Sequence, residues 1–369
     1  MYQPQFTITN KILKNIGLIE AAREVILNAP LIPAYLMKFR KEALNRTVHY
    51  GTHLEGNALN LNQAIKVLEG EQVVARERDV QEVINYRRVI HFIDELAKFK
   101  EKTSRNKPAE KERKIRWRYT QKMIKKIHAL VCERIISLEQ QGQYRITQVI
   151  LRETSTGEVF FRPPPAVEVP YLVEDFVHWI NLKTACEIHP VLRAGVAHYV
   201  LAAIHPFVEG NGRTARAFAT LVLFAERYDI KRFFALEEYF DRDAASYYQA
   251  LFKVSAQSEE LEKRDLTPWL EYFCEVMAIE LTQVKERVRR LSLDAKVKSR
   301  LGRQIPLNER QIRLMEYLEE NQRLKTSQAK KLIPEYSEDT LLRDLNYFVK
   351  KGIVKKRGKT KGAVYIMKQ

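Results

Sequence analysis

Apolar residues recur at helical spacing along most of the chain, while glycine and proline are sparse at 13 each among 369 residues. The stretch 80–99 is typical, because its apolar side chains recur every three or four residues and so share one face of an α-helix. The same spacing predicts one or two helices over 11–44, interrupted near Pro30 and Pro33, and further helices over 117–138, 191–204, 217–228 and 235–251. The pattern therefore predicts a mainly α-helical protein.

A different pattern occurs at 148–162. Two β-rich runs, Val149–Leu151 and Val159–Phe161, flank a turn that contains Gly157, and three prolines follow at 163–165. Two such runs around a glycine-containing turn are typical of a β-hairpin. We therefore expect one hairpin inside an otherwise helical region.

Residues 307–369 predict a separate small domain. Their apolar positions indicate three helices, the third capped by Ser337 and ended by Gly352, and then a second hairpin with the basic turn 355–361. Three helices and a basic hairpin resemble a winged helix-turn-helix, which places one helix in the DNA major groove and its wing against phosphate. Winged helices also serve as protein-docking or dimer modules, and the acidic side chains of the third helix suit groove reading poorly: Glu338, Asp339 and Asp344.

The formal net charge of +17 is concentrated in two regions. Residues 100–126 carry a net charge of +9 and residues 291–369 one of +10, so the remainder is near −2. Concentrated positive charge favours polyanions such as nucleic acid. The first region also fits a solvated loop and helix face, so DNA is expected as a partner only through 307–369.

The three cysteines, Cys132, Cys186 and Cys274, are scattered and lack metal-binding spacing. They are typical of reduced thiols in a cytoplasmic protein. The sequence begins without an apolar signal region and has no apolar run of about 18 residues, so we expect no membrane partner.

The most informative stretch is 205–216, which reads His-Pro-Phe-Val-Glu-Gly-Asn-Gly-Arg-Thr-Ala-Arg between two apolar helical runs. This layout predicts a loop that leads into a helix N-terminus, where backbone N–H groups bind phosphate. Gly210 and Gly212 allow the backbone to form an anion-binding nest. Arg213 and Arg216 share one helix face and can grip a polyphosphate.

Two further residues of this stretch carry chemistry. Glu209 is an oxygen ligand suited to a Mg²⁺ that bridges phosphates. His205 is the only group of the stretch with an ordinary pKa near 7, which makes it the candidate general base.

Residues 205–216 fill every defined position of the motif HPFx[D/E]GNGRxxR, so the chain resembles the Fic family, the Fic/Doc superfamily. The resemblance extends from about Asn45 to Tyr272, and the segment from His189 to Tyr199 looks like the family's central helix. It implies a Fic-type helical core in which the hairpin 148–162 is a flap that holds a segment of a target protein by strand addition.

The resemblance also implies an activity: transfer of AMP from ATP to a Ser, Thr or Tyr hydroxyl of a target protein, with Mg²⁺ held through Glu209. His205 takes the hydroxyl proton, Arg213 holds the β-phosphate side and Arg216 orders the γ-phosphate. Asn211, with the N–H groups around Gly210 and Gly212, stabilises charge on the α-phosphate. Phe207 anchors the loop. The remaining residues implied are two further ATP-binding positions, Thr214 and Ala215, and an adenine-side group, Arg242, Tyr247 and Tyr248.

The segment Tyr50–Asn57 carries a second resemblance, to Fic proteins with an N-terminal inhibitory helix, whose motif reads [S/T]xxxE[G/N]. Glu55 and Gly56 fit the motif, but the first position is Gly51, and Thr52 is the nearest hydroxyl that can stand in for it. The resemblance implies that Glu55 pairs with Arg216 and prevents it from ordering the γ-phosphate, because one carboxylate and one phosphate compete for one guanidinium. A surface glutamate at a helix end remains the alternative.

We therefore expect three regions: an N-terminal helical region with the inhibitory motif (1–110), a Fic catalytic core (111–290) and a winged helix-turn-helix (291–369). Transfer of another nucleotide or phosphate group, removal of AMP, and a DNA-binding regulator with a nucleotide-sensing core stay open as alternatives. Relatives with an inhibitory helix often form dimers, so a homodimer is a further expectation.

Overall fold

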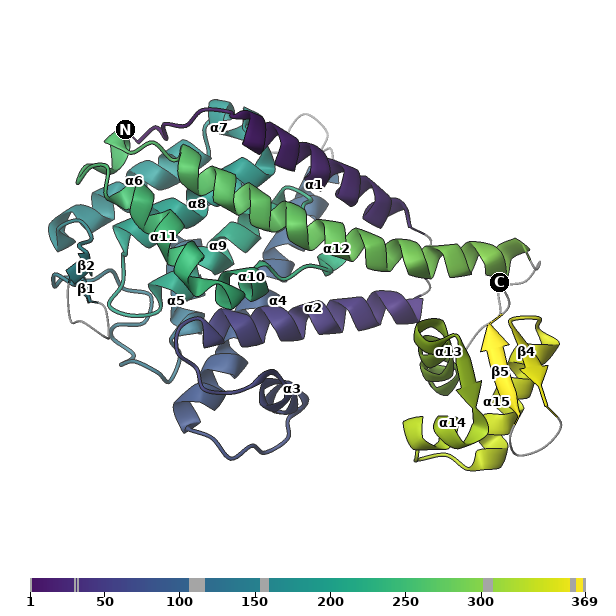
Figure 1. Ribbon diagram of the computed structural model, residues 1–369. Helices are drawn as coiled ribbons and strands as arrows, with labels where there is room; N and C mark the ends of the chain where they lie inside the picture. Colours follow the sequence, from purple (N-terminus) through teal and green to yellow (C-terminus); the bar gives the residue numbers. More distant parts are fainter. Residues whose placement is uncertain are drawn as a thin grey trace. The chain divides into compact units, whose positions relative to one another are not determined.

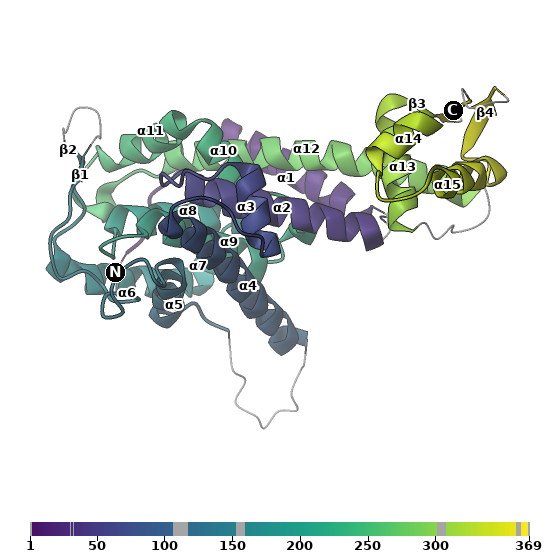
Figure 2. The ribbon, with the colours of Figure 1, turned by 90° about the horizontal axis from the view of Figure 1, so that it is seen from below.

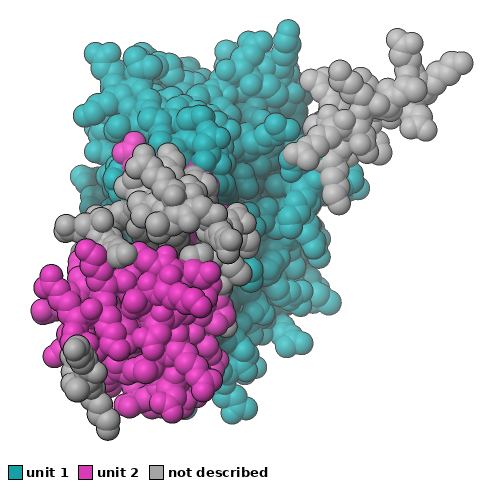
Figure 3. Space-filling model, turned by 90° about the vertical axis from the view of Figure 1, so that its right-hand side faces the viewer, with its two compact units in different colours: residues 1–28, 36–287 teal, residues 29–35, 288–369 magenta. Residues whose placement is uncertain are grey.

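The computed structural model describes residues 2–29, 31, 33–105, 117–152, 159–300, 308–358 and 363–367. The chain divides into two compact units, one of residues 1–28 and 36–287 and one of residues 29–35 and 288–369 (Figure 3). The boundary expected at 110/111 lies outside the described residues.

The first unit is mainly helical, as the apolar spacing predicts (Figure 1). Its helices are α1 (Asn10–Asn28), α2 (Pro33–His53), α3 (Leu61–Glu69), α4 (Glu77–Arg105), α5 (Gln121–Val131), α6 (Val169–Ile180), α7 (Lys183–Glu187), α8 (Pro190–Ile204), α9 (Asn211–Ala225), α10 (Leu236–Arg242), α11 (Ala244–Ser255) and α12 (Thr267–Arg300). Short 3₁₀ turns lie at Ala166–Glu168, Ile230–Arg232 and Leu261–Lys263.

Helix α8 forms the centre of this unit. Almost all of its side chains are buried, which is typical of a helix enclosed on every side. It packs most extensively against α9, and α9 in turn packs against α4 and α5. Helix α12 approaches α8 closely at Gly195, whose carbonyl accepts a 2.8 Å hydrogen bond from the indole of Trp269. The paired helices α8 and α9 therefore hold the stretch that joins them, 205–210, inside the fold.

Several element boundaries differ from the sequence expectation. Helix α2 continues past residue 44 to His53, which brings the end of the helix next to Glu55. The single helix expected over 235–251 is two helices, because the chain breaks at Asp243, whose carboxylate accepts from Ser246 N at 3.1 Å and caps α11. Helix α5 is shorter than 117–138 and ends at Val131.

The first hairpin is present as the antiparallel pair β1 (Leu151–Arg152) and β2 (Val159–Phe161). Its expected turn around Gly157 lies outside the described residues. The pair lies beside α11, because Phe161 lines one pocket together with Phe252 and Ser255 (Figure 2).

The second unit contains α13 (Glu309–Asn321), α14 (Thr326–Leu332) and α15 (Glu338–Lys350) with a three-stranded antiparallel sheet. The strands β3 (Arg323–Lys325), β4 (Val354–Arg357) and β5 (Val364–Met367) take the order β3-β5-β4. Strands β4 and β5 are the predicted second hairpin, whereas β3 was not expected, because its three residues are too few to show an alternating pattern. Within the turn 355–361, residues 359–361 lie outside the described part.

Among the described residues, no helix is both long enough and apolar enough to cross a membrane.

Candidate active site

The stretch 205–210 is a tight loop between α8 and α9. His205 ends α8 with φ 51° and ψ 60°, and Gly210 precedes α9 with φ 74° and ψ 14°, so both ends of the loop are left-handed. A Cβ at Gly210 would lie 2.6 Å from Cys132 Sγ, so only glycine fits there. The loop therefore delivers the chain directly into the N-terminus of α9, where the backbone N–H groups of the first turn are not used within the helix.

The side chain of Asn211 braces this loop. Its amide oxygen accepts from Phe207 N and its amide nitrogen donates to Phe207 O, both at 2.8 Å. Thr214 donates its hydroxyl to Gly210 O at 2.8 Å, and Ala215 is fully buried. These side chains therefore take part in hydrogen bonds and packing within the fold. An anion at the N-terminus of α9 would meet backbone N–H groups there.

His128 of α5 supports the loop, a role that the sequence did not predict. Its ring is buried and stacks on Phe207 with centroids 3.7 Å apart. Its Nδ1 accepts from Gly142 N at 2.9 Å, so Nε2 carries the proton that it donates to Glu209 O, also at 2.9 Å. Burial lowers the pKa of His128 to about 4, which keeps this arrangement neutral. A lone histidine on an apolar helix gives no local sequence signal for such a role.

His205 presents a neutral imidazole to the site. Its Nδ1 lies 3.3 Å from Ala202 O, and since a carbonyl only accepts, Nδ1 carries the proton and Nε2 keeps its lone pair. Burial lowers the pKa of His205 to about 4. The geometry therefore supplies a ready proton acceptor at neutral pH.

Arg145 fixes the loop to the base of the β1–β2 hairpin. Its guanidinium donates to His205 O at 2.8 Å and to Thr147 O at 3.3 Å, and it also contacts Pro164 O. Its backbone N donates to Pro206 O at 2.9 Å. The side chain is buried, and burial lowers its pKa. One guanidinium thus ties both ends of the hairpin to the backbone of His205.

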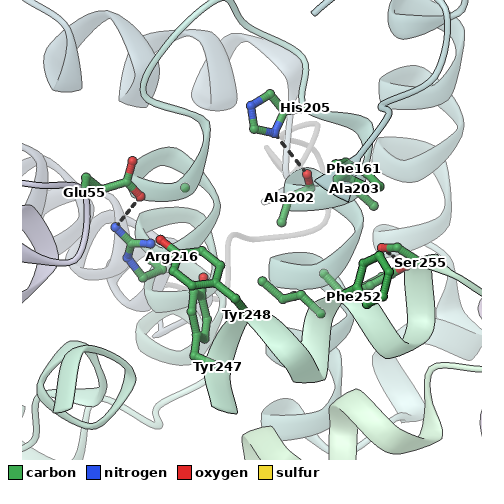
Figure 4. Close-up of a pocket in the computed structure, with 13 residues that line it drawn as sticks. Glu55, Phe161, Ala202, Ala203, His205, Arg216, Tyr247, Tyr248, Phe252 and Ser255 are labelled. Carbon is green, nitrogen blue, oxygen red and sulfur yellow. Dashed lines mark hydrogen bonds and ion pairs between the residues drawn. The ribbon is translucent and has the colours of Figure 1, made fainter. Parts of the chain in front are cut away.

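Arg216 and Glu55 form an ion pair across the site (Figure 4). Arg216 Nη2 lies 2.9 Å from Glu55 Oε1 and 3.0 Å from Gly51 O. Burial raises the pKa of Glu55, but the charges of Arg216 and Arg213 outweigh it, so the pKa is held below its ordinary value. Glu55 is therefore ionised and neutralises a buried guanidinium.

Position 51 holds glycine where the inhibitory motif has Ser or Thr, and the structure gives a reason for this difference. A Cβ at this position would lie 2.4 Å from the ring of Tyr86, so the close packing of α2 on α4 excludes a larger residue. Thr52 does not replace the missing hydroxyl, because its Oγ1 donates back to Val48 O at 3.1 Å and His49 O at 2.9 Å. The backbone carbonyl of Gly51 contacts Arg216 instead.

His205, Glu55 and Arg216 line one pocket, together with Gly212, Tyr247 and Tyr248 (Figure 4). The hydroxyl of Tyr247 lies 3.0 Å from His198 Nε2, and that of Tyr248 donates to Leu54 O at 3.2 Å.

Arg242, which was expected on the adenine side, does not line this pocket. Its guanidinium is largely exposed and pairs with Glu238 at 2.5 Å, one helical turn earlier in α10.

Arg213 and Glu209 lie among charged residues of α4. Arg213 Nη1 is 3.2 Å from Glu82 Oε1, and Arg213 Nη2 is 3.7 Å from Glu209 Oε1. Arg78 contacts the same Glu209 oxygen. Arg78 and Glu82 were missed by the sequence analysis, because charges in a long polar helix resemble a solvated face.

The donor set fits a metal shared with a nucleotide. Within the described part of the chain, no group of three or more His, Cys, Asp or Glu side chains could hold a metal ion. Glu209 alone offers one carboxylate, and Mg²⁺ is commonly bound by one or two carboxylates together with substrate phosphates. A guanidinium already lies against this carboxylate, so the position accepts positive charge.

Residues 118–223, which contain the loop and the N-terminus of α9, match the model of the Fic/DOC family. This part of the chain is similar to Fic/DOC domains. The protein adenylyltransferase Fic of Drosophila grimshawi is 30% identical over 197 residues, which are 53% of this chain and 36% of that protein. Its namesake in Aedes aegypti is 31% identical over 193 residues, or 52% and 34%. The chain thus spans about a third of the length of these curated relatives.

Solved structures agree on the fold. A Fic family protein from Desulfovibrio desulfuricans has a TM-score of 0.65 at 20% identity and covers 100% of this chain and 98% of its own. A Fic domain containing signaling protein from Bacteroides thetaiotaomicron has a TM-score of 0.59 at 22% identity and covers 76% and 98%. The chain therefore has a mainly helical Fic fold, and the second unit adds a small three-stranded sheet.

Proposed function

We propose that this chain is a protein adenylyltransferase that moves AMP from ATP to a Ser, Thr or Tyr hydroxyl of a target protein and is inhibited by its own Glu55. The observation that carries the proposal is the Glu55–Arg216 ion pair in the pocket that His205 also lines. The relatives whose Fic region resembles this one are named protein adenylyltransferases.

In the transfer, the hydroxyl oxygen of the target attacks the α-phosphorus of ATP. The bond from the α-phosphorus to the bridging oxygen of the β-phosphate breaks, and pyrophosphate leaves. His205 Nε2 takes the proton of the hydroxyl, a role for which its neutral state prepares it. The backbone N–H groups at the start of α9 attract negative charge, because they form the positive end of a helix of 15 residues.

The two arginines of the motif bind the outer phosphates in this proposal. Arg213 is buried and its Nη1 pairs with Glu82, but its Nε makes no hydrogen bond within the described part of the chain and can donate to a phosphate. A bound Mg²⁺ would neutralise phosphate charge beside Glu209. Arg216 would hold the γ-phosphate, but only after Glu55 releases it. The ion pair therefore accounts for inhibition by simple competition.

The rest of the pocket suits a nucleoside and a peptide. Tyr247 and Tyr248 line it and would flank the adenine. The β1–β2 hairpin, at the core of the proposed flap 148–162, would hold a target segment by adding a strand, with Phe161 facing the pocket. Arg145 would then keep the hairpin, and with it the target segment, in register with His205, because its guanidinium donates to both Thr147 O and His205 O.

AMP removal is a second candidate, because Glu55 is ionised and lines the same pocket as His205. A carboxylate in this place can orient a water molecule toward an AMP-modified hydroxyl. Incubation of a modified target with the wild-type protein tests this directly.

DNA binding by the second unit is a separate proposal. The edge strand β4 exposes Lys355, Lys356 and Arg357 in succession. Asp344, which seemed to oppose groove reading, is buried and bonded to Gln311 at 2.7 Å, so it adds no negative charge to the surface of α15. Arg343 and Lys350 are exposed on that helix.

Transfer of label from ATP to protein in cell lysate tests the main proposal. Wild type, Glu55→Gly and His205→Ala are compared with α-labelled and γ-labelled ATP in the presence of Mg²⁺. We expect label from the α-phosphate alone, strongest with Glu55→Gly, and a loss of about 10²–10⁴-fold with His205→Ala. Equal labelling by wild type and Glu55→Gly would contradict inhibition, and the absence of α-label in every variant would contradict AMP transfer.

A further inference from the structure

Four charged side chains form a closed ring between α4 and the catalytic loop: Arg78, Glu82, Glu209 and Arg213. Arg78 Nε donates to Glu82 Oε1 at 3.2 Å, and Arg78 Nη2 contacts Glu209 Oε1. Arg213 closes the ring, with Nη1 at 3.2 Å from Glu82 Oε1 and Nη2 at 3.7 Å from Glu209 Oε1. The ring contains two positive and two negative charges and is therefore balanced without a metal ion.

The ring is anchored on Glu82. This carboxylate is buried, and its Oε2 accepts from Asn57 Nδ2 at 2.9 Å. Asn57 also donates to Asp79 O at 2.9 Å, so the residue two positions after Glu55 is fixed to the same helix. Glu82 thus holds Arg78 and Arg213 in place from one side.

Arg78 differs from Arg213 in its freedom to move. About half of the Arg78 side chain is exposed (53%), whereas Arg213 is almost completely buried (3%). Arg78 does not line the pocket of His205 and Arg216. It can therefore withdraw from Glu209 into solvent and still keep its bond to Glu82.

The position that Arg78 occupies is the one a divalent cation needs. A cation held through Glu209 would share a carboxylate whose Oε1 the Arg78 guanidinium now contacts, and two positive groups at one carboxylate repel each other. We propose that Arg78 is a tethered cation that competes with Mg²⁺ for Glu209, so that metal binding requires Arg78 to turn away. The inference rests on the proposed function in one respect, that Glu209 is the carboxylate that binds the metal.

Metal affinity measured without turnover tests the inference. Mn²⁺ is titrated by electron paramagnetic resonance into Glu55→Gly protein saturated with α,β-methylene ATP, which cannot transfer AMP. The same background carries Arg78→Gln or, as the matched control, Arg88→Gln. Arg88 lies on the same helix, is similarly exposed and also contacts a glutamate, Glu133, outside the site.

We expect Arg78→Gln to tighten Mn²⁺ binding roughly two- to fivefold, the range of a partly exposed ion pair, and Arg88→Gln to leave it unchanged. Binding of the nucleotide in EDTA should be the same in all three proteins. Unchanged or weaker Mn²⁺ binding in Arg78→Gln would overturn the inference, and a loss of nucleotide binding in EDTA would show instead that Arg78 is a phosphate ligand.

A second measurement separates this inference from the proposed function. If no variant binds the nucleotide analogue, the proposed function fails, and a double-mutant cycle of Arg78→Gln and Glu209→Gln on thermal unfolding in EDTA still decides whether the pair exists. Non-additive shifts that become additive in excess Mn²⁺ support competition. Additive shifts in EDTA refute it.

Discussion

At the scale of single residues, the site depends on side chains whose charge is set by burial. His205 and His128 are both neutral because burial lowers each pKa to about 4. Glu55 and Arg216 are both charged because each neutralises the other. The loop is thus held by a neutral histidine, whereas the proposed inhibition depends on a charged pair.

The lowered pKa of His205 predicts a flat pH profile for transfer. A base with the ordinary histidine pKa of about 6.5 would lose about tenfold in its active form between pH 7.5 and 5.5. With a pKa of about 4, His205 stays neutral over this range. We expect kcat/KM of Glu55→Gly to change less than threefold from pH 7.5 to 5.5, and a tenfold decrease would show that burial does not hold the base neutral.

The same shift has a consequence for stability. Between about pH 6.5 and 4 the unfolded chain binds a proton at residue 205 that the folded chain does not. The stability from this residue is therefore fully present above about pH 6.5 and is lost as the pH falls toward 4. His128 contributes in the same direction.

At the scale of elements, the contact between α2 and α4 places the segment that carries Glu55. Gly51 lets the two helices approach at Tyr86, and α2 then ends at His53, just before Glu55. The turn that follows is fixed to α4 through Asn57 and Glu82. Helix α4 therefore positions both the segment that carries Glu55 and the ring of charges around Glu209.

The packing of Tyr86 against Gly51 predicts the effect of placing the serine of the motif at position 51. Gly51→Ser should destabilise the protein by about 1–3 kcal/mol, because its Cβ meets the Tyr86 ring and the helices must separate. Gly17→Ser, at an exposed position of α1 with nothing within 4 Å of its Cβ, is the control and should be neutral or stabilising. Urea unfolding measures both. A neutral Gly51→Ser would mean that α2 and α4 do not pack this closely.

At the scale of the whole molecule, the residues of the pocket and the exposed basic residues of β4 belong to different compact units. The residues that line the pocket of His205 and Arg216 belong to the first unit, and the exposed basic strand β4 belongs to the second. The positive charge of β4 can therefore bind a polyanion without the residues of the pocket taking part.

If β4 contacts DNA phosphate, its charges set the salt dependence of binding. Changing Lys355, Lys356 and Arg357 to alanine should weaken binding of any duplex and flatten the slope of log K against log salt by about one for each residue. Arg313→Ala is the control, because Arg313 pairs with Glu335 at 2.6 Å and its charge is already balanced. Mobility shifts between 50 and 200 mM salt measure the slope. An unchanged slope would place the DNA contact elsewhere or exclude it.

The sequence by itself determined the local features. Apolar spacing predicts the helical class, and the residues of 205–216 predict a phosphate-binding loop before a helix, because both depend on neighbours a few positions apart. The pairing of Glu55 with Arg216 was also expected, although only through resemblance.

Only the tertiary structure decided how these residues interact with one another. Asn211 braces the loop, Arg242 lies outside the pocket, and the roles of Arg145, His128, Arg78 and Glu82 had no local signal. Arg145, His128 and Arg78 contact His205 O, Glu209 O and Glu209 Oε1, which lie 60, 81 and 131 positions away and come close only when α4, α5, α8 and α9 pack. Burial, which sets the charge of His205 and His128, likewise exists only in the packed chain.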